Sequence, residues 1–239
     1  MYRVERSHWW YAGMESITRH LLNRWYCPSQ GLNILDAGCG TGAAMTTYLA
    51  EYGKVTGFDL SPLALEFCRL RNAPRLACAS GVALPFLSGS FDLVTSFDVL
   101  YESSVTSDSL AIKESSRVLR PGGRILLRLP AYDWLRGRHD EAVHTARRYT
   151  SGRLAELLRE NGFVVEHLSY ANMFLFPLAM LKRLTEWIVP NGGDVGSDLT
   201  FDVGFLNQAL KTVLRAEAPL VSRGHLPFGL SVLAVGRKI

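Results

Sequence analysis

The sequence predicts an α/β fold built on a doubly wound, mostly parallel β-sheet. Two observations support this prediction. First, apolar strand-like segments alternate with helix-like segments along the chain, and this alternation favours right-handed crossovers with helices on both faces of the sheet. Second, the apolar run Ile34–Leu35 closes on Asp36 and on three alternate glycines that end at Gly42. This is the pattern of a buried strand that turns sharply into a helix.

The first half of the chain is expected to contain a leading helix and five strands. The leading helix covers about 14–26. Strands are expected near 33–36, 55–59, 75–79, 91–97 and 123–129. A helix over about 43–52 follows the first strand, and further helices connect the later strands.

The second half is expected to complete the sheet and to insert helices before its last strand. Ser151 is predicted to be the N-cap of a helix over 152–161 that ends at Asn161 and Gly162. The remaining elements are a strand over 163–168, an apolar helix or helix pair over 172–189, a helix over 201–216 and a last strand over 230–235. These bring the sheet to seven strands.

Composition excludes several classes of protein. With 239 residues, 48% hydrophobic and 20% charged, the chain can bury a large core and is not a disordered protein. No apolar run approaches the roughly 18 residues of a membrane-spanning helix, and the N-terminal residues lack the apolar core of a secretory signal. Cytoplasmic placement is therefore expected. The net charge of +4 is mild and is not gathered in a long basic tract, which disfavours nucleic acid as a partner.

The four cysteines show no paired C-x-x-C spacing. No metal site and no disulfide framework are expected from this spacing, and reduced, mostly buried thiols are predicted.

The glycine turn predicts a cofactor site. Glycines permit positive φ, and their missing Cβ atoms let a ligand approach the backbone, while the following helix points free N–H groups at that ligand. Asp59 closes the next apolar segment, at a separation where a βαβ unit presents a carboxylate to a ribose. The spacing is G-x-G-x-G, which differs from the G-x-G-x-x-G of dinucleotide sites. An ordinary tight turn is the alternative.

Three further motifs follow in order. They are Leu84-Pro85-Phe86, Gly89-Ser90-Phe91-Asp92-Leu93-Val94 and Leu119–Leu127, with the sequence LRPGGRILL. Together with Asp36–Gly42 and Asp59 they resemble the class I S-adenosylmethionine-dependent methyltransferases, in particular the small-molecule branch with an LPF…FD motif. The resemblance covers about 33–129. It implies a Rossmann-like, seven-stranded, mostly parallel sheet with an antiparallel last strand, and S-adenosylmethionine as cofactor.

The chain is then expected to be one methyltransferase domain over 1–239. Residues 1–30 form a helical N-terminal lid and residues 31–130 form the cofactor-binding half. Residues 131–239 form the acceptor-side half, with a helical insertion over about 172–217.

The resemblance also implies roles for individual residues. Asp59 would hold the ribose hydroxyls, where charge-assisted hydrogen bonds contribute about 1.5–3 kcal/mol each, and Leu60 would pack on the adenine. Asp36 would lie near the aminoacyl end of the cofactor. The alternatives are a solvated turn residue for Asp59 and a strand-end or capping acid for Asp36. Many relatives carry an acid for the adenine amino group where this chain has Ser80.

Adenine recognition is therefore assigned to Ser80, Gly81 and Val82, through hydroxyl and backbone groups. Asp98 matches an acid that relatives often carry beyond the fourth strand. The complete set of predicted cofactor-binding residues is Trp10, Asp36, Gly38, Cys39, Gly40, Gly42, Asp59, Leu60, Ser80, Gly81, Val82 and Asp98.

The aromatic segment Ser7–Tyr11 resembles a branch in which the start of the leading helix closes over the cofactor, which is the reason for including Trp10. Packing of the adjacent tryptophans between helix and sheet is the alternative. Relatives usually continue with arginines where this chain has Gly13, Met14 and Glu15. No contact from these positions to the cofactor carboxylate is predicted.

Catalytic candidates lie after the fifth strand. Methyl transfer depends mainly on alignment, for which effective molarities reach about 10⁵–10⁸ M. A general base adds about 10²–10⁴-fold for an acceptor that must lose a proton. The segment 138–150 resembles an H-D-x-x-x-H-x-x-R-R-Y-T pattern of one bacterial branch, and His144, His139 and Tyr149 are the candidates. Packing or capping of a lid is the alternative for the histidines, and a core position is the alternative for Tyr149.

The predicted acceptor is a small molecule methylated on O or N, which includes lipids and secondary metabolites. The apolar run Met173–Leu181 is expected to form a pocket wall or lid. Peripheral contact with a membrane surface, core packing and a dimer contact remain open for this run, so the chain is expected to be a monomer or a homodimer. Alternative functions are a nucleic-acid or protein methyltransferase, a nicotinamide oxidoreductase and an inactive cofactor-binding protein.

Overall fold

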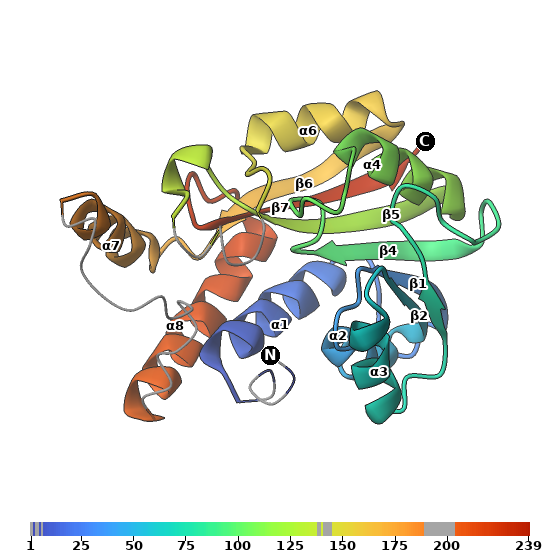
Figure 1. Ribbon diagram of the computed structural model, residues 1–239, viewed down its shortest axis with the longest axis horizontal. Helices are drawn as coiled ribbons and strands as arrows, with labels where there is room; N and C mark the ends of the chain where they lie inside the picture. Colours follow the sequence, from blue (N-terminus) through green and yellow to red (C-terminus); the bar gives the residue numbers. More distant parts are fainter. Residues whose placement is uncertain (1, 3–4, 6, 138–139, 141–144, 189–203) are drawn as a thin grey trace.

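The computed structural model describes residues 2, 5, 7–137, 140, 145–188 and 204–239. Its centre is a seven-stranded sheet with the strand order β3-β2-β1-β4-β5-β7-β6 (Figure 1). The strands are β1 (Leu32–Ala37), β2 (Gly53–Asp59), β3 (Leu76–Cys78), β4 (Phe91–Phe97), β5 (Leu119–Pro130), β6 (Phe163–Ala171) and β7 (Ser231–Lys238). Their number confirms the sequence prediction.

The pairing also confirms the predicted directions. Strand β1 runs parallel to β2 and β4, β2 runs parallel to β3, and β4 runs parallel to β5. Strand β7 is antiparallel to both β5 and β6. The chain winds outward from β1 to β3 and then returns to β4 on the other side of β1. Ligands of open α/β sheets bind beyond the carboxyl ends of the strands at such a reversal of strand order.

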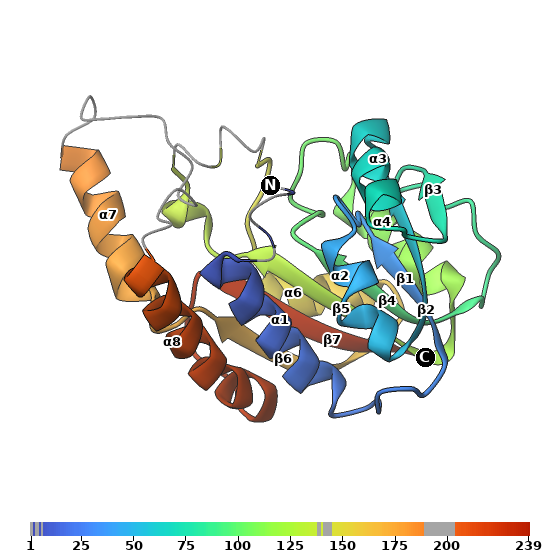
Figure 2. The same ribbon diagram turned by 90° about the horizontal axis from the view of Figure 1, so that it is seen from below.

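Helices cover both faces of the sheet, as Figures 1 and 2 show. One face carries α4 (Asp108–Val118) and α6 (Ser151–Glu160). On the other face α1 (Trp9–Leu22) and α8 (Gly204–Arg223) lie side by side, and α2 (Ala43–Thr46) and α3 (Pro62–Leu70) cover the part of the sheet next to β1 and β2. Helix α7 (Phe176–Ile188) stands at one end of the molecule, away from the centre of the sheet.

Alternation along the strands creates two hydrophobic cores. Ile34 and Leu126 face the core under α1 and α8, and their neighbours Leu35 and Leu127 face the core under α4 and α6. Successive side chains of a strand point to opposite faces, so near-continuous apolar strands are what a sheet covered on both sides requires. Gly13 lets α1 approach α8, because a Cβ at this position would lie 2.3 Å from Leu214 Cδ1.

Several helix boundaries differ from the predictions. The predicted helix over 43–52 is shorter: α2 stops at Thr46, Thr47 leaves helical geometry at φ −115° and ψ −105°, and a 3₁₀ turn over Leu49–Glu51 follows. The N-cap of α6 is Thr150 and not Ser151, because the Thr150 side chain accepts a hydrogen bond from Arg153 N. The predicted and observed N-caps are neighbours in the sequence, and serine and threonine are both good caps.

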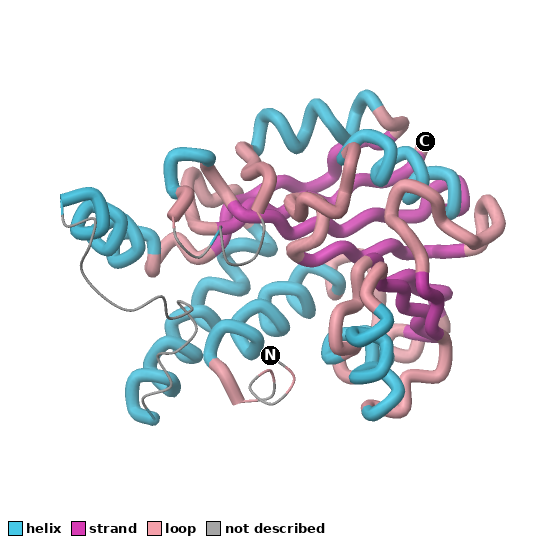
Figure 3. Tube along the Cα trace, viewed as in Figure 1, coloured by secondary structure: helices cyan, strands magenta, loops and turns pink. Residues whose placement is uncertain are grey.

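The leading helix begins earlier than predicted, at Trp9, because His8 caps it by accepting from the Trp10 amide. Its C-cap is Asn23, so the predicted last turn up to residue 26 is not helical. The predicted insertion before β7 is present as α7 and α8, and α8 continues to Arg223 with Pro219 inside it. Figure 3 shows the sheet in magenta with helices in cyan on both of its faces.

The prediction of mostly buried thiols is met in part. The four thiols are free, as expected, but only Cys39 and Cys68 are buried, whereas Cys27 and Cys78 are exposed. Across the described ranges, none of the helices is both long enough and apolar enough to cross a lipid bilayer.

Candidate functional site

The glycine turn after β1 leaves one stretch of bare backbone. Gly38, Gly40 and Gly42 all have positive φ, at 72°, 54° and 77°. A Cβ on Gly38 would lie 2.4 Å from Val99 Cγ2, and one on Gly42 would lie 2.9 Å from Cys68 Sγ. A Cβ on Gly40 would meet no atom of the described residues within 4 Å. Gly40 is therefore the glycine at which a ligand can reach the backbone.

The end of β2 holds this turn in place. Asp59 Oδ2 accepts a hydrogen bond from Gly40 N at 2.9 Å, and Asp59 Oδ1 accepts one from Ser61 N at 2.9 Å. The amides of Gly38 and Cys39 both donate to Phe58 O at 2.9 Å. The structure thus brings together Asp59 and the glycines, which sequence reasoning had placed in one site. The Cys39 side chain turns away into the core, where its sulfur lies 3.8 Å from that of Cys68.

Asp36, at the end of β1, is a buried acid with one neutral hydrogen-bond partner. Its side chain is 3% exposed and accepts from Thr95 Oγ1 at 2.9 Å. Burial raises its pKa from 3.8 to about 6, while the Thr95 hydroxyl and the charge of Arg128 oppose the rise. A carboxyl group whose pKa is raised by burial is a common feature of functional sites.

The next two strands contribute an ion pair. Asp98 follows β4 with a left-handed φ of 58°, and its amide donates to Arg128 O at 2.9 Å. The Arg128 guanidinium contacts the Asp98 carboxylate at 2.7 Å and lies 5.0 Å from the centre of the Phe97 ring. Sequence reasoning missed Arg128. The available signal was a cation inside the otherwise apolar run ILLRLP of β5.

The predicted adenine-binding segment forms a turn beyond β3. Ser80 pairs with Ala83 in an isolated bridge, and the Ser80 hydroxyl accepts from Val82 N at 3.4 Å. Ser80, Gly81 and Val82 are half-buried, and Leu60 is exposed across from them at the end of β2. Contact of these residues with adenine stays a prediction.

The N-terminal segment contacts the glycine turn through residues that sequence reasoning missed. Glu5 is buried and pairs with Arg71 at 2.6 Å, and it also accepts from the Thr41 hydroxyl. Arg71 donates to Thr41 O at 2.9 Å and lies 4.4 Å from the Tyr2 ring. No signal in the sequence links Glu5 to Arg71, because their 66-residue separation is bridged only by the fold.

Trp10 lies on α1, half-buried against the core and in edge contact with Trp9 at 5.8 Å. This position matches the packing alternative, and a role for Trp10 at the cofactor stays a prediction.

The segment after β5 is fixed by a buried ion pair. Arg148 contacts both oxygens of Asp140, at 2.8 and 3.0 Å, and donates to Ala131 O at 2.8 Å. Burial by itself would raise the pKa of Asp140, but the hydrogen bonds from Arg148 and the Gly137 amide hold it below its usual value. Arg148 is thus engaged inside the protein. His139 and His144 lie outside the described residues.

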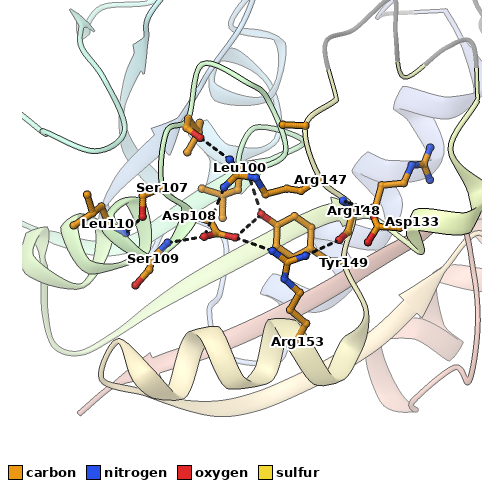
Figure 4. A network of polar contacts seen from close by, with 12 residues as sticks. Leu100, Ser107, Asp108, Ser109, Leu110, Asp133, Arg147, Arg148, Tyr149 and Arg153 are labelled. Carbon is orange, nitrogen blue, oxygen red and sulfur yellow. Dashed lines mark hydrogen bonds and ion pairs between the residues drawn. The ribbon is translucent and has the colours of Figure 1, made fainter.

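Tyr149 is a core residue, and Figure 4 shows the polar contacts around it. Its side chain is fully buried, and its hydroxyl lies 3.2 Å from Leu100 O and 3.1 Å from Asp108 Oδ2. Arg153 stacks 5.0 Å from the ring centre. Burial and the nearby Asp108 charge raise the pKa of Tyr149 above its ordinary value. A hydroxyl enclosed in this way does not reach an acceptor, which corrects the catalytic prediction for Tyr149.

Aromatic side chains gather beyond the carboxyl ends of β5 and β6. Tyr132 stacks on Tyr170 at 5.1 Å between ring centres, and Trp134 and Phe228 each contact Phe176 at the start of α7. Trp134 is 56% exposed and Leu178 of α7 is 64% exposed. This group forms an apolar surface on the acceptor side of the predicted site.

Residues 35–127 match the family model of the methyltransferase domain. This match identifies residues 35–127 as a methyltransferase domain of the class I S-adenosylmethionine-dependent type. The chain is 34% identical over 144 residues to the ubiquinone/menaquinone biosynthesis C-methyltransferase of Paracoccus denitrificans, a match that covers 54% of this chain and 56% of the relative. It is 39% identical over 101 residues to the malonyl-[acyl-carrier protein] O-methyltransferase of Erwinia pyrifoliae, covering 41% and 37% of the two chains.

Among solved structures, the methyltransferase resembles the geranyl diphosphate C-methyltransferase of Streptomyces coelicolor in complex with Mg²⁺, geranyl diphosphate and S-adenosylhomocysteine. The TM-score is 0.60 at 16% identity, and the match covers 93% of this chain and 77% of that one. At this identity the likeness shows the fold alone. The chain spans about half the length of the curated relatives it matches.

Proposed function

We propose that this protein transfers a methyl group from S-adenosylmethionine to an O or N atom of an apolar small molecule. The observation that carries the proposal is the combination of bare backbone at Gly40 with two acids on the flanking strand ends. Asp59 is hydrogen-bonded to Gly40 itself, and Asp36 is buried one strand away.

These residues suit the cofactor chemically. S-Adenosylmethionine, when bound, supplies a methyl group already activated on a sulfonium sulfur. Asp59 offers carboxylate oxygens to ribose hydroxyls at the end of β2, and the half-buried turn at Ser80–Val82 offers a polar edge and an apolar wall to a base. Asp36, whose pKa is raised by burial, would gain a counter-charge from a nearby cationic ligand.

The acceptor class rests on the aromatic group beyond β5 and on the relatives. Trp134 and Phe228 expose apolar surface there, next to the exposed face of α7. The names of two relatives mention ubiquinone/menaquinone biosynthesis and malonyl-[acyl-carrier protein], and one solved structure of the same fold holds geranyl diphosphate. An acceptor with an apolar part is therefore favoured. His144 and His139 remain the proposed bases, because they belong to the segment that continues from this group.

Calorimetric titration of the purified protein with S-adenosylmethionine, S-adenosylhomocysteine and NADH tests the cofactor assignment. We expect micromolar binding of the first two and no binding of NADH. Binding of NADH alone would overturn the methyltransferase proposal in favour of an oxidoreductase. Once binding is established, turnover with lipophilic hydroxyl and amine compounds tests the acceptor class, with release of S-adenosylhomocysteine as the readout.

A further inference from the structure

We propose that Arg128, together with Asp98 and Asp36, binds the charged amino-acid end of the cofactor. Arg128 would take the carboxylate, and the two acids would take the ammonium group. This inference rests on the proposed function. It assigns a cofactor contact to Arg128 on β5, a residue that lies outside the glycine turn and was not among the predicted cofactor-binding residues.

The first argument is the incomplete pairing of a buried cation. The Arg128 side chain is 9% exposed, and both its Nε, at 2.9 Å, and its Nη2, at 2.7 Å, contact the same oxygen of Asp98. A guanidinium carries five N–H donors in a planar fork. Within the described residues, all of its side-chain hydrogen bonds go to this one carboxylate oxygen. Buried charges are normally matched more completely, so the fork retains donors for a second carboxylate.

The second argument is position. Asp59, Asp36, Asp98 and Arg128 stand at the ends of β2, β1, β4 and β5, which are four consecutive strands of the sheet. Adjacent strands lie about 4.8 Å apart. A ligand whose ribose is held at β2 and whose chain crosses the Gly38–Gly40 turn therefore continues toward β4 and β5. Arg128 lies at the end of that path.

The third argument is enclosure. Tyr11 of α1 and the buried Tyr48 both feel the charge of Arg128, which lowers their pKa values against the larger rise that burial causes. Tyr11 also feels Asp98, and Asp36 feels Arg128. The guanidinium thus lies near both acids, in contact with Asp98 at 2.7 Å and close enough to Asp36 to lower its pKa. A zwitterion of one carboxylate and one ammonium matches a site made of one guanidinium and two carboxyls.

Helix α1 offers no competing cation at its centre. Gly13 packs on Leu214, Met14 is buried in the core, and Glu15 pairs with Arg19. Among the residues that the structure describes, Arg128 is the cation whose charge acts on Asp36.

The test compares two ligands that share the nucleoside. S-Adenosylhomocysteine carries the amino-acid end, whereas 5′-methylthioadenosine lacks it. The double variant Arg128→Met with Asp98→Asn removes both charges together, which avoids leaving one buried and unpaired. We expect its affinity for S-adenosylhomocysteine to fall at least 30-fold, while its affinity for 5′-methylthioadenosine changes less than threefold.

A matched control uses an ion pair on the same strand. Arg124 pairs with Glu166 at 2.6 Å near the other end of β5, and the double variant Arg124→Met with Glu166→Gln should bind both ligands as the unmodified protein does. If the Arg128 double variant does not fold by circular dichroism, Arg128→Lys carries the test. It keeps the charge but loses the fork, and we expect a 3- to 10-fold loss for S-adenosylhomocysteine alone.

The outcomes separate the two proposals. An equal loss for both ligands would show a merely structural role for Arg128, and unchanged binding of S-adenosylhomocysteine would show no role at the cofactor. Either result overturns the inference and leaves the proposed function standing. Failure of the unmodified protein to bind either ligand would instead overturn the cofactor assignment itself.

Discussion

The two halves of the candidate site are built by different means. On the cofactor side, backbone geometry does most of the positioning: the turn over 38–42 is tied by its amides to Phe58 and Asp59, and its positive φ values occur at glycines. On the acceptor side, side chains do the positioning, through the aromatic contacts of Tyr132, Trp134 and Phe176 and the exposed face of α7.

This difference has a chemical reason. A shared cofactor presents the same groups in every family member, so a backbone cradle with a few acids is sufficient. An acceptor is selected by the shape and polarity of side chains, which can change without disturbing the sheet. Changes on the cofactor side should therefore weaken cofactor binding by tenfold or more, whereas changes on the proposed acceptor side should alter the KM of the acceptor by smaller factors.

Filling the open space at Gly40 should produce the largest effect. Gly40→Val adds a side chain where no atom of the described residues lies within 4 Å of the Cβ position, and it also strains a backbone at φ 54°. We expect a loss of S-adenosylhomocysteine affinity greater than about 100-fold, which corresponds to about 2.7 kcal/mol. Calorimetric titration measures it.

Gly122→Val is the matched control for backbone strain. Gly122 has φ 75°, also has open space at its Cβ position, and lies within β5 near the start of that strand. Both variants should lose similar thermal stability, by about 1–2 kcal/mol. If Gly122→Val also loses the ligand, strain and not occupancy explains the effect at Gly40.

Removing the charge of Asp36, the buried acid at the end of β1, should stabilise the folded protein. The folded protein keeps a proton on Asp36 up to about pH 6, whereas the unfolded chain releases it near 3.8. Stability attributable to this group is therefore highest at low pH and is lost as pH rises from about 4 to 6. At pH 7.5, Asp36→Asn should raise the unfolding free energy by about 1–3 kcal/mol, at about 1.4 kcal/mol per pKa unit.

The same substitution should weaken binding of S-adenosylmethionine, so stability and affinity should change in opposite directions. Denaturant unfolding at pH 4 and pH 7.5 measures the stability difference, which should nearly vanish at pH 4. A destabilised Asp36→Asn protein at pH 7.5 would mean that the Asp36 carboxylate is paired more strongly than its contact with Thr95 indicates.

The comparison also explains which parts of the site were accessible from sequence. The glycine turn and Asp59 could be recognised because they are local features of the sequence. A tight turn with positive φ at a strand end requires glycines within a few consecutive positions. Arg128 was missed because its partner Asp98 is 30 residues away and its burial depends on α1. The Glu5–Arg71 contact was missed for the same reason, since pairing across folded elements leaves no spacing rule.

Side-chain direction also limited the sequence predictions. Tyr149 follows two arginines in a segment that resembles a motif, so a catalytic role was predicted with a core position as the alternative. The segment returns to β5 through the hydrogen bond from Tyr149 N to Pro130 O at 2.9 Å, and the ring enters the core. Likewise, the predicted and observed N-caps of α6 differ by one residue because Thr150 and Ser151 carry equivalent hydroxyls. Hydrophobic periodicity encodes neither the direction of the Tyr149 side chain nor the choice between these two caps.

Removing the ribose acid should have an intermediate effect. Asp59→Ala eliminates the carboxylate that accepts from Gly40 N and Ser61 N. We expect at least a tenfold loss of S-adenosylmethionine affinity, because hydrogen bonds to charged groups contribute about 1.5–3 kcal/mol. Glu156→Ala, on the exposed surface of α6, serves as the control in the same titration. Unchanged affinity in a folded Asp59→Ala protein would remove the ribose assignment.

The smallest effect is expected on the acceptor side. Trp134 is 56% exposed and contacts Tyr132 and Phe176 with ring centres 5.5 and 6.0 Å apart. Trp134→Ala should raise the KM of a lipophilic acceptor about 3- to 10-fold, because burying part of an aromatic side chain contributes about 1 kcal/mol. Its affinity for S-adenosylhomocysteine should be unchanged.

Leu87→Ala is the control. It removes apolar surface that is 83% exposed in the loop before β4, and it should alter neither the KM of the acceptor nor the affinity for S-adenosylhomocysteine. If Trp134→Ala weakens cofactor binding as much as acceptor binding, the two halves of the site are not separable and the contrast between them fails.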